Sequence, residues 1–458
     1  MKHLGIEVTV KNVPELDPGF IPLNQFNRAY LSKADRPLDV AVERSNGQVA
    51  VWHTRFRGTP EFAEADAYYV ERVIKTMLWI YGGFRVYLSD PGLAEKMRRL
   101  YRAGGRQAFD WDYMSDVFEH PFEIVACEKT PEEKSLAKAI GRHLDGCRIG
   151  FDAGGSDRKV SAVIDGEPVF SEEVVWFPKT NADPDYHYDG IVSALKSAAE
   201  HLPRVDAVGV SSAGVYINDR TMNASLFLKV PRDLFDAKVK DIYIRAITDT
   251  FGPVPFAVAN DGDVTALAGA MSLGENNVLG IAMGTSEAAG FVDADGNITG
   301  WLNELAFVPV DANPAAMRDE WSGDIGCGVK YFSQDAVIKL APAAGIALAE
   351  SLSPAEKLKE IQKLMERPGS PAEAIFRSIG VYLGHALDMY YRYYRFRHVL
   401  LLGRVMSGRG GDVILDTAKA VLADEYPETA AAIFPTLPDE RARRVGQSVA
   451  AASLPALN

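Results

Sequence analysis

The hydrophobic pattern contains one especially informative segment, an apolar strand that runs into two adjacent glycines within residues 149–163. Apolar residues 149–151 lead through Asp152 into the turn Gly154-Gly155-Ser156, and a second apolar run leaves the turn at 160–164. Adjacent glycines let backbone amides approach an anion. The Ser156 hydroxyl adds a donor, and Asp152 can hold Mg²⁺, usually through water. The same letters also fit an ordinary glycine-rich hairpin turn, so this segment alone leaves both interpretations open.

Two further glycine-rich turns follow apolar strands in the second half of the chain. They are Gly284-Thr285-Ser286 after residues 278–283, and a loop containing Gly403 and Gly408 after residues 398–402. A turn directly after a strand lies at the rim of a sheet, where open α/β sheets bind their ligands. Two such turns from two domains can hold the phosphates of one nucleotide, and the third can hold its base and ribose.

The remaining pattern alternates strands and helices, which indicates an α/β protein. Residues 1–35 contain several prolines and predict coil, whereas 38–56 predict a hairpin around Asn46-Gly47. Helices are predicted at 65–81, 189–202, 235–251 and within 255–274, and strands at 84–89 and 205–214. The hairpin, helix and strand of 38–89 repeat the order seen in 149–212. The N-terminal third is therefore either a degenerate copy of that unit or an unrelated α/β region.

Composition and charge exclude several classes of function. The 458 residues are 47% hydrophobic and 24% charged, and the net charge of −13 argues against a nucleic-acid surface. No apolar run reaches the length of a membrane span, and the N-terminus lacks the apolar core of a signal peptide. The three cysteines, Cys127, Cys147 and Cys327, show no zinc-ligand spacing. We therefore expect a cytoplasmic protein with neither nucleic-acid nor membrane partners and no structural zinc.

Six collinear segments over residues 148–458 resemble the ROK (repressor, open reading frame, kinase) sugar kinases of the actin-like ATPase superfamily. IGFDAGGSDRKVSAV and IAMGTSEAAGFV resemble the two phosphate motifs, and LLLGRVMSG resembles the adenosine motif. VGVSSAGVYINDRTMNASLF resembles the sugar-side loop, VANDGDVTALAG the Glu-Asn-Asp helix start, and RVGQSVAAASL the terminal helix.

The resemblance implies a duplicated, ribonuclease H-like α/β fold with a cleft between its domains, plus an extra N-terminal α/β segment. The expected boundaries are an accessory region at 1–147, a small domain at 148–254, a large domain at 255–440, and a C-terminal helix at 441–458 that returns to the small domain. The expected activity is ATP-dependent phosphorylation of a hydroxyl on a sugar or sugar derivative, with Mg²⁺. Members of the family often pair, so a homodimer is a further expectation.

The resemblance also assigns roles to individual residues. Asp261 is the expected general base, which accepts the proton of the attacking hydroxyl. Asn260 and Glu304 are expected to bind the sugar, and Asn223 is expected to line the sugar side. Asn260 or Asp261 could equally cap the helix that follows, and the two roles can coexist. The expected nucleotide-binding residues are Asp152, which also holds Mg²⁺, and Gly154, Gly155, Ser156, Gly284, Thr285, Ser286, Gly403 and Gly408.

Three positions depart from the family pattern. Ala259 replaces a glutamate, Phe307 stands where a histidine is expected, and Arg404 replaces a glycine. The zinc cluster that follows the histidine in the family is reduced to Cys327. These departures leave a non-catalytic protein that senses a sugar or nucleotide as the alternative to a kinase. The N-terminal third is not patterned like a winged helix-turn-helix, which argues against a DNA-binding repressor.

Overall fold

The computed structural model describes residues 1–135, 140–367, 369–438 and 446–457. Contacts divide the chain into two compact units. Unit 1 comprises Met1–Leu136, Ile281–Ala288 and Trp301–Leu437. Unit 2 comprises Ala137–Gly280, Ala289–Gly300 and Pro438–Asn458. Each unit is described by itself.

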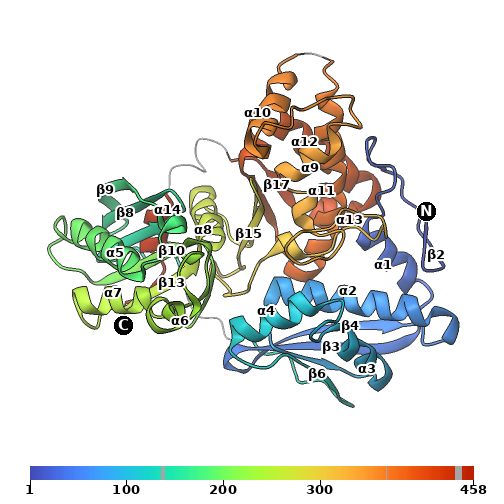
Figure 1. Cartoon of the computed structure of the whole chain (residues 1–458), viewed down its shortest axis with the longest axis horizontal. Helices are drawn as coiled ribbons and strands as arrows, with labels where there is room; N and C mark the ends of the chain where they lie inside the picture. The colour runs from blue at the N-terminus through green and yellow to red at the C-terminus, as the bar shows by residue number, and fades with distance from the viewer. Residues whose placement is uncertain (136–139, 368, 439–445, 458) are drawn as a thin grey trace. The chain divides into compact units, whose positions relative to one another are not determined.

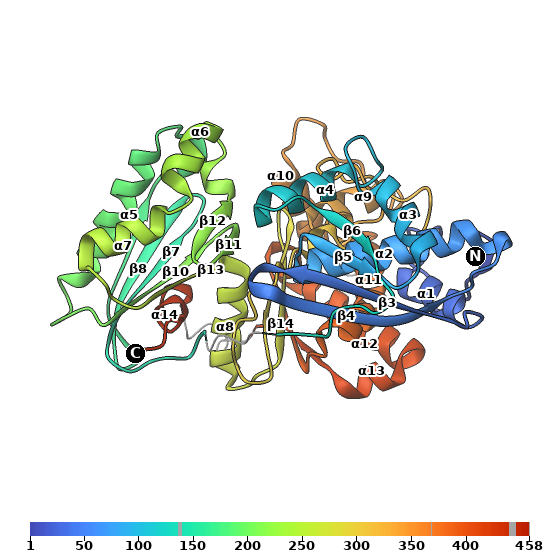
Figure 2. The same cartoon turned by 90° about the horizontal axis from the view of Figure 1, so that it is seen from below.

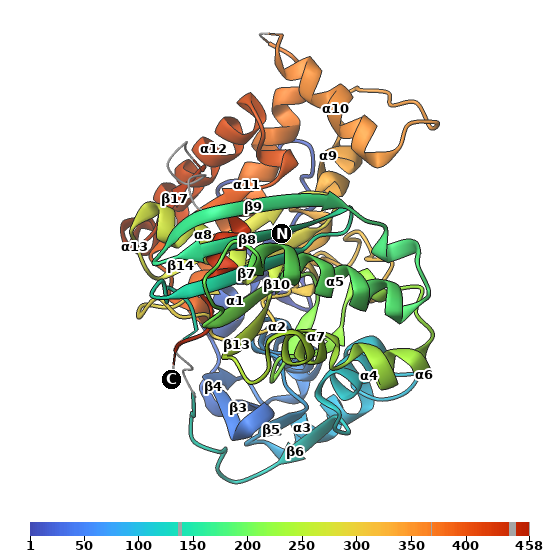
Figure 3. The same cartoon turned by 90° about the vertical axis from the view of Figure 1, so that its left-hand side faces the viewer.

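Unit 2 is built on a five-stranded sheet of order β13-β10-β7-β8-β9 (Figure 3). Strands β7, β8 and β9 form an antiparallel meander, whereas β10 and β13 run parallel to β7. The strands are β7 (Cys147–Ala153), β8 (Asp157–Ile164), β9 (Glu167–Val175), β10 (Ala207–Ser212) and β13 (Phe256–Asn260). A small hairpin, β11 (Val215–Ile217) and β12 (Arg220–Asn223), follows β10.

Alternate residues along β7 and β10 face opposite layers of unit 2, as the two-residue period of a strand requires. Ile149, Phe151, Val208 and Val210 join the apolar core formed with α5 (Pro184–Ala199) and α7 (Ile242–Phe251). Glycines 150 and 209 face the other way, and a Cβ atom on either would lie within 2 Å of the backbone of α14 (Gln447–Ala452). Small residues on one face therefore allow the C-terminal helix to pack directly on the sheet (Figure 2).

The N-terminal part of unit 1 carries a four-stranded sheet of order β4-β3-β5-β6 (blue to cyan in Figure 1, with all four strands labelled in Figure 2). The predicted hairpin is confirmed as β3 (Arg36–Arg44) and β4 (Gln48–Phe56), and both Asn46 and Gly47 have positive φ. Helix α2 (Ala63–Tyr81) packs on both strands. Also present are β5 (Arg85–Leu88), α3 (Pro91–Leu100), α4 (Ala108–Phe118) and β6 (Glu123–Ala126).

One expectation for the N-terminal third needs correction, and one of the two alternatives left open for it is excluded. The predicted coil of 1–35 contains a small hairpin, β1 (Lys2–His3) with β2 (Ile6–Glu7), and a helix, α1 (Leu23–Leu31), whose Phe26 and Tyr30 are fully buried. Strand β5 runs antiparallel to β3, whereas β10 runs parallel to β7. The N-terminal sheet therefore has a different topology from the unit 2 sheet, and it is not a copy of that sheet.

The rest of unit 1 combines helices with part of a second four-stranded sheet, of order β15-β14-β16-β17. Its strands are β14 (Val278–Met283), β15 (Glu287–Val292), β16 (His398–Leu402) and β17 (Phe434–Thr436), and the boundary between the units falls within β14 and β15. The helices of unit 1 in this region are α9 (Gln334–Leu340), α10 (Pro354–Met365), α11 (Ala372–Tyr394), α12 (Arg409–Glu425) and α13 (Pro427–Ala432).

Two more helical predictions concern unit 2. The helix predicted within 255–274 is confirmed as α8 (Asp261–Leu273). The long helix predicted at 235–251 is instead interrupted, with α6 (Arg232–Leu234), a π-helical turn at Phe235–Val239, and then α7. In the part of the chain that the structure describes, helices are either too short or too polar for a bilayer crossing.

Candidate functional site

The predicted site residues fall into two sets, one in each unit. In unit 2, strand register brings the predicted carboxylates to one edge of the sheet. Asp152 pairs with Ser211 across β7 and β10, and Ser212 pairs with Asn260 across β10 and β13. The three strands are parallel, so their carboxyl ends share an edge, and Asp261 follows at the first turn of α8. This edge is where open α/β sheets place ligands.

A hydrogen-bond network joins these strand ends to the C-terminal helix. The Ser211 hydroxyl donates to Asp152 Oδ1 at 2.8 Å. Gln447 Nε2 donates both to Ser211 Oγ at 3.0 Å and to the backbone oxygen of Asp261 at 3.1 Å. Burial raises the pKa of Asp152 to about 6, the Ser211 hydrogen bond opposes the rise, and the nearby Asp261 adds to it. Two carboxyl groups therefore share this edge, and the charge of Asp261 acts on Asp152.

Asn260 and Asp261 begin helix α8. The Asn260 side chain caps the helix by accepting a hydrogen bond from Gly262 N at 2.7 Å, and its Nδ2 donates to Gly214 O at 2.7 Å. The capping alternative is therefore correct for Asn260. Burial raises the pKa of Asp261, while the amide of Gly262 and the charge of Lys179 lower it. A buried carboxylate with a raised pKa is a stronger base than an exposed one, as a proton-accepting role requires.

The turn Gly154-Gly155-Ser156 is part of the β7–β8 hairpin, as the simpler interpretation expected. The side chain of Lys179 lies over this turn. Trp176 Nε1 donates to Gly154 O at 2.8 Å and holds the turn. A Cβ atom on Gly155 would lie 2.7 Å from Lys179 Cε and 2.9 Å from its Nζ. The Lys179 ammonium therefore lies directly over the glycine turn, where its charge would favour a bound phosphate. The Ser156 hydroxyl donates to Asp157 Oδ2 at 3.0 Å.

Asn223 lies at the end of β12, with its side chain exposed. A Cβ atom on Gly214 would lie 2.3 Å from Asn223 O, so the backbone of Asn223 adjoins Gly214. Gly214 in turn accepts the hydrogen bond from Asn260 described above. The structure thus brings the two predicted sugar-side asparagines into one neighbourhood.

In unit 1 the second and third glycine turns adjoin each other. A Cβ atom on Gly403, which has φ +93°, would lie 2.3 Å from Met283 O, directly before Gly284. Gly284 N donates to Ser286 O at 2.9 Å, and Gly284 O accepts from the first residue of α9, Gln334, at 2.9 Å. Thr285 and Ser286 are exposed. Gly408, with φ +65°, precedes the first residue of α12.

Glu304 and Phe307 are held by the N-terminal part of unit 1. Glu304 N donates to Trp79 O at 2.9 Å, near the end of α2. The Phe307 ring packs against the rings of Trp79 and Phe109, with centroids 4.3 and 5.6 Å apart. Burial raises the pKa of Tyr113, and the charge of Glu304 adds to the rise, which places Tyr113 near the same segment. The N-terminal region thus supports the segment that carries Glu304.

Glu287, directly after the second turn, is a buried carboxyl group that the sequence did not single out. Neither of its oxygens has a hydrogen-bond partner among the described residues, and the same is true of the Tyr390 hydroxyl. A Cβ atom on Gly328 would lie 2.4 Å from Glu287 Oε2, so the carboxyl occupies the space over that glycine. Burial, and then the charge of Glu304, raise the pKa of Glu287 well above its ordinary value. Glu287 therefore lies close to the predicted sugar-binding glutamate.

Four residues of these sets were missed by sequence reasoning. Ser211 carried a usable signal, because it follows an apolar strand in the same way as Asp152. Glu287 interrupts an otherwise apolar run after a glycine turn, which is a weaker signal. Lys179 and Gln447 show no pattern, since only the folded chain brings them to Gly155 and Ser211.

The described residues contain no group of three or more His, Cys, Asp or Glu side chains that could hold a metal ion. Cys127, Cys147 and Cys327 are not disulfide-bonded. The expectation that no structural zinc is bound stays a prediction. Mg²⁺ does not require an all-protein cage, because it keeps water and phosphate ligands alongside one or two carboxylates. Asp152 is a carboxylate of that kind.

The topology of unit 2 is that of a ribonuclease H-like domain, the building unit of the actin-like ATPases. Strand order β9-β8-β7-β10-β13, with a meander followed by two parallel strands, defines it. No family model and no curated protein matches the chain. Solved structures do match it, and the resemblance in fold is to ROK proteins.

A ROK hexokinase from Thermus thermophilus matches with a TM-score of 0.52 and 18% identity, over 67% of this chain and 97% of the hexokinase. A ROK-family transcriptional regulator, a homolog of the E. coli MLC protein, matches with a TM-score of 0.51 and 17% identity, over 68% of this chain and 79% of the regulator. The chain has the fold of the ROK proteins, which confirms the fold class expected from the sequence.

Proposed function

We propose that this chain is a member of the ROK family that transfers a phosphoryl group from ATP to a hydroxyl of a sugar or sugar derivative. The observation that carries the proposal is the pair of buried carboxylates, Asp152 and Asp261, at one sheet edge of unit 2. They lie beside a glycine turn that is covered by the Lys179 ammonium. The hexokinase likeness supports the reaction class.

In the proposed reaction Asp261 accepts the proton of the substrate hydroxyl. The hydroxyl oxygen then forms a bond to the γ-phosphorus while the bond to the ADP oxygen breaks. Burial keeps the pKa of Asp261 raised, so the carboxylate gains basicity for this step. Asn260 keeps the start of α8 in place by capping it, so Asp261 is presented from a fixed helix turn.

Phosphate binding is assigned to two turns. In unit 2, Gly154 and Gly155 would take a phosphate group next to the Lys179 ammonium. In unit 1, a Cβ atom on Gly284 would meet only Ser286 O, at 3.8 Å, so the space beside this turn is open to a ligand. Mg²⁺ with ATP would neutralise phosphate charge, and Asp152 would hold it through water. We assign Gly403 and Gly408 to the adenosine side.

A sugar-sensing protein without catalysis is the second candidate. The fold of a ROK regulator is nearly as similar to this chain as the fold of the hexokinase. Ala259, Phe307 and Arg404 are the departures that favour it. Phe307 packs on the rings of Trp79 and Phe109, so an apolar ring stands where the family pattern has a hydrogen-bonding one.

Asp261→Asn separates the two candidates. Asparagine can occupy the helix start but cannot accept the proton, so turnover should fall by about 10²–10⁴. The melting temperature and nucleotide binding should change little. Asp295→Asn, at an exposed turn of the same unit, is the matched control and should retain full activity. ADP release is measured over a sugar panel with Mg-ATP, and sugar binding is measured by calorimetry. Full turnover by Asp261→Asn would refute the assignment, and sugar binding without any turnover in the wild type would favour the sensor.

A further inference from the structure

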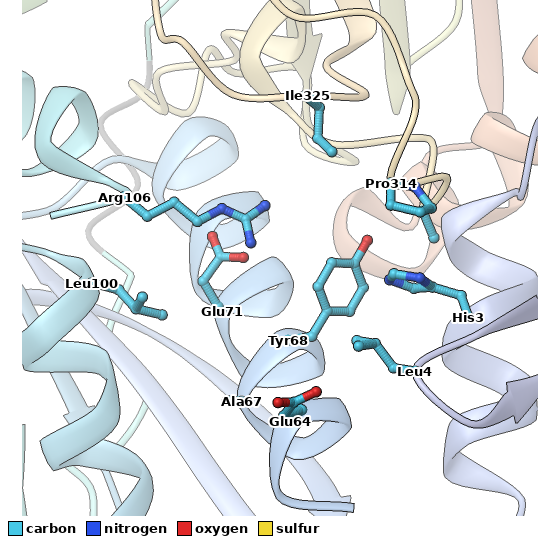
Figure 4. A pocket seen from close by; sticks show the side chains of 11 residues that line it. His3, Leu4, Glu64, Ala67, Tyr68, Glu71, Leu100, Arg106, Pro314 and Ile325 are labelled. Carbon is cyan, nitrogen blue, oxygen red and sulfur yellow. The ribbon is translucent and has the colours of Figure 1, made fainter.

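Unit 1 contains a cavity between the β1–β2 turn, helix α2 and the residues that follow α3 (Figure 4). Two charged groups that line it, Arg106 and Glu71, have partners within the protein. Arg106 pairs with Asp324 at 3.4 Å, and Arg72 pairs with Asp324 at 2.8 Å. Arg72 also donates to Glu71 at 2.6 and 2.8 Å. This ion network joins α2 to the segment that carries Asp324, and it does not mark a site for a charged ligand.

A second polar network, in unit 2, ends instead on the two carboxylates to which the proposed function assigns roles. It begins at Gln447, the first residue of α14, and passes through Ser211, near the end of β10. Ser211 is fully buried, and Asp152, to which it donates, is only 8% exposed. Hydrogen bonds between buried groups are not readily replaced by water, so this network can hold its members in a defined arrangement.

The direction of each hydrogen bond in this network follows from one acceptor. Gln447 Nε2 lies 3.1 Å from the backbone oxygen of Asp261. A carbonyl oxygen can only accept, so the Gln447 atom that faces it is the amide nitrogen. The same nitrogen donates its second N–H to Ser211 Oγ at 3.0 Å, and Ser211 donates its own hydrogen to Asp152 Oδ1 at 2.8 Å. One side-chain amide thus holds the start of α8 directly and Asp152 through a single hydroxyl.

The backbone that carries Gln447 is itself held against the sheet of unit 2 (Figure 2). The next residue, Ser448, forms a hydrogen bond with Ser161 of β8, with 2.7 Å between the two hydroxyl oxygens. A Cβ atom on Gly150 would lie 1.6 Å from Ser448 O, so α14 approaches β7 as closely as only a glycine permits. The Gln447 side chain therefore extends from a fixed backbone.

We propose that Gln447 is a positioning residue, which holds Asp152 and Asp261 at the separation that phosphoryl transfer requires. The inference rests on the proposed function, in which Asp152 holds Mg²⁺ through water and Asp261 accepts the proton of the substrate hydroxyl. The base and the metal-held phosphate act on the same hydroxyl oxygen. A change in the spacing of the two carboxylates would therefore misalign the reacting atoms.

Two substitutions test this role. Gln447→Met keeps the length of the side chain and removes both donors, and Gln447→Glu keeps its shape and replaces the donors with acceptors. With the panel sugar that the wild type phosphorylates fastest, both should lower kcat about 10–100-fold. KM for that sugar should change little, because the lost interactions align the reacting groups and do not bind the sugar. Both should also raise the Mg²⁺ concentration that half-saturates ADP binding, measured by calorimetry, about 10–100-fold.

The matched control is Ser448→Ala, which removes a hydrogen bond between α14 and the sheet but touches neither carboxylate. It should lower the melting temperature slightly and leave kcat and the Mg²⁺ requirement unchanged. Ser211→Ala cuts only the branch to Asp152, so it should reproduce the Mg²⁺ effect. Adding Gln447→Met to Ser211→Ala should then shift the Mg²⁺ requirement no further, but it should still lower kcat through the lost hydrogen bond to Asp261.

Wild-type kcat and Mg²⁺ requirement in both Gln447 variants would overturn the positioning role alone. Equal losses in Ser448→Ala would also overturn it, because the docking of α14 would then explain them. If the wild type binds ADP with Mg²⁺ but phosphorylates no sugar, the proposed function falls. The Mg²⁺ requirement of ADP binding then still decides whether Gln447 positions Asp152. A wild type that binds no ADP with Mg²⁺ would overturn both.

Discussion

Replacement of Glu287 tests whether a buried carboxyl without hydrogen-bond partners weakens unit 1. Its side chain is buried, both oxygens lack partners among the described residues, and burial raises its pKa well above the ordinary 4.5. Above about pH 4.5 the unfolded chain releases this proton, but the folded chain keeps it. The folded state then binds more protons, so the free energy of unfolding falls as the pH rises.

The size of this effect follows from one titrating group. Each pH unit between the ordinary and the folded pKa costs about 1.4 kcal/mol. Glu287→Gln has the same shape and does not titrate. Relative to wild type, it should therefore gain stability as the pH rises above about 4.5, by up to about 1.4 kcal/mol per pH unit while the folded carboxyl stays protonated. For a unit of this size that corresponds to a relative rise in melting temperature of roughly 2 °C or more per pH unit.

The assay is the melting temperature of both proteins, by scanning fluorimetry, at several pH values from about 5 to 8. Glu360→Gln, at an exposed position of α10, is the control, and its difference from wild type should stay flat with pH. If the difference in melting temperature between Glu287→Gln and wild type is also independent of pH, burial does not keep the folded carboxyl protonated, and the reasoning fails at that step. A lower melting temperature for Glu287→Gln at every pH would refute the reasoning outright.

Two further predictions concern charged groups. Because burial raises the pKa of Asp152 to about 6, protons should compete with Mg²⁺ below that pH. The apparent Mg²⁺ affinity measured from turnover should fall about tenfold per pH unit there, and a pH-independent affinity would contradict the assigned role. Asp324→Asn leaves Arg72 and Lys75 buried with less negative charge, so it should cost about 3–5 kcal/mol. Glu95→Gln, at an exposed pair, should cost under about 0.5 kcal/mol in the same denaturant titration, and equal costs would contradict the prediction.

The sequence predicted the parts of the fold that local chemistry determines. Asn46-Gly47 specifies a tight hairpin because both residues tolerate positive φ, and the structure shows both with positive φ. Asp152 and Asp261 were recognisable because each follows an apolar strand that ends at a sheet edge. The interrupted helix at 235–251 was not predictable, because its π-helical turn changes the backbone without changing the apolar period enough to be visible.

The rest of the candidate site depends on contacts between distant parts of the chain. Lys179 lies 24 residues beyond Gly155, and Gln447 lies 236 residues beyond Ser211. No spacing rule connects such positions, since only the packed sheet and α14 bring them together. The same applies to Glu287 and Gly328, which are complementary in size only once folded. A sequence reading finds residues that act through their immediate neighbours, and it misses residues that act across the fold.

The N-terminal region is integral to unit 1, and this bears on how substrate recognition is built. Its helix α2 supplies Arg72 and Lys75 to Asp324, both with side chains at most 1% exposed, and supplies Trp79 to Phe307 and to the backbone of Glu304. Charges buried in this way are costly unless every partner is present. The Glu304 segment therefore takes its position from the N-terminal region through backbone hydrogen bonds and ring packing, and Asp324 takes its position through ion pairs. If the proposed function holds, residues of α2 and α4 that never touch a sugar should still alter which sugar is accepted, because they determine where Glu304 and Phe307 lie.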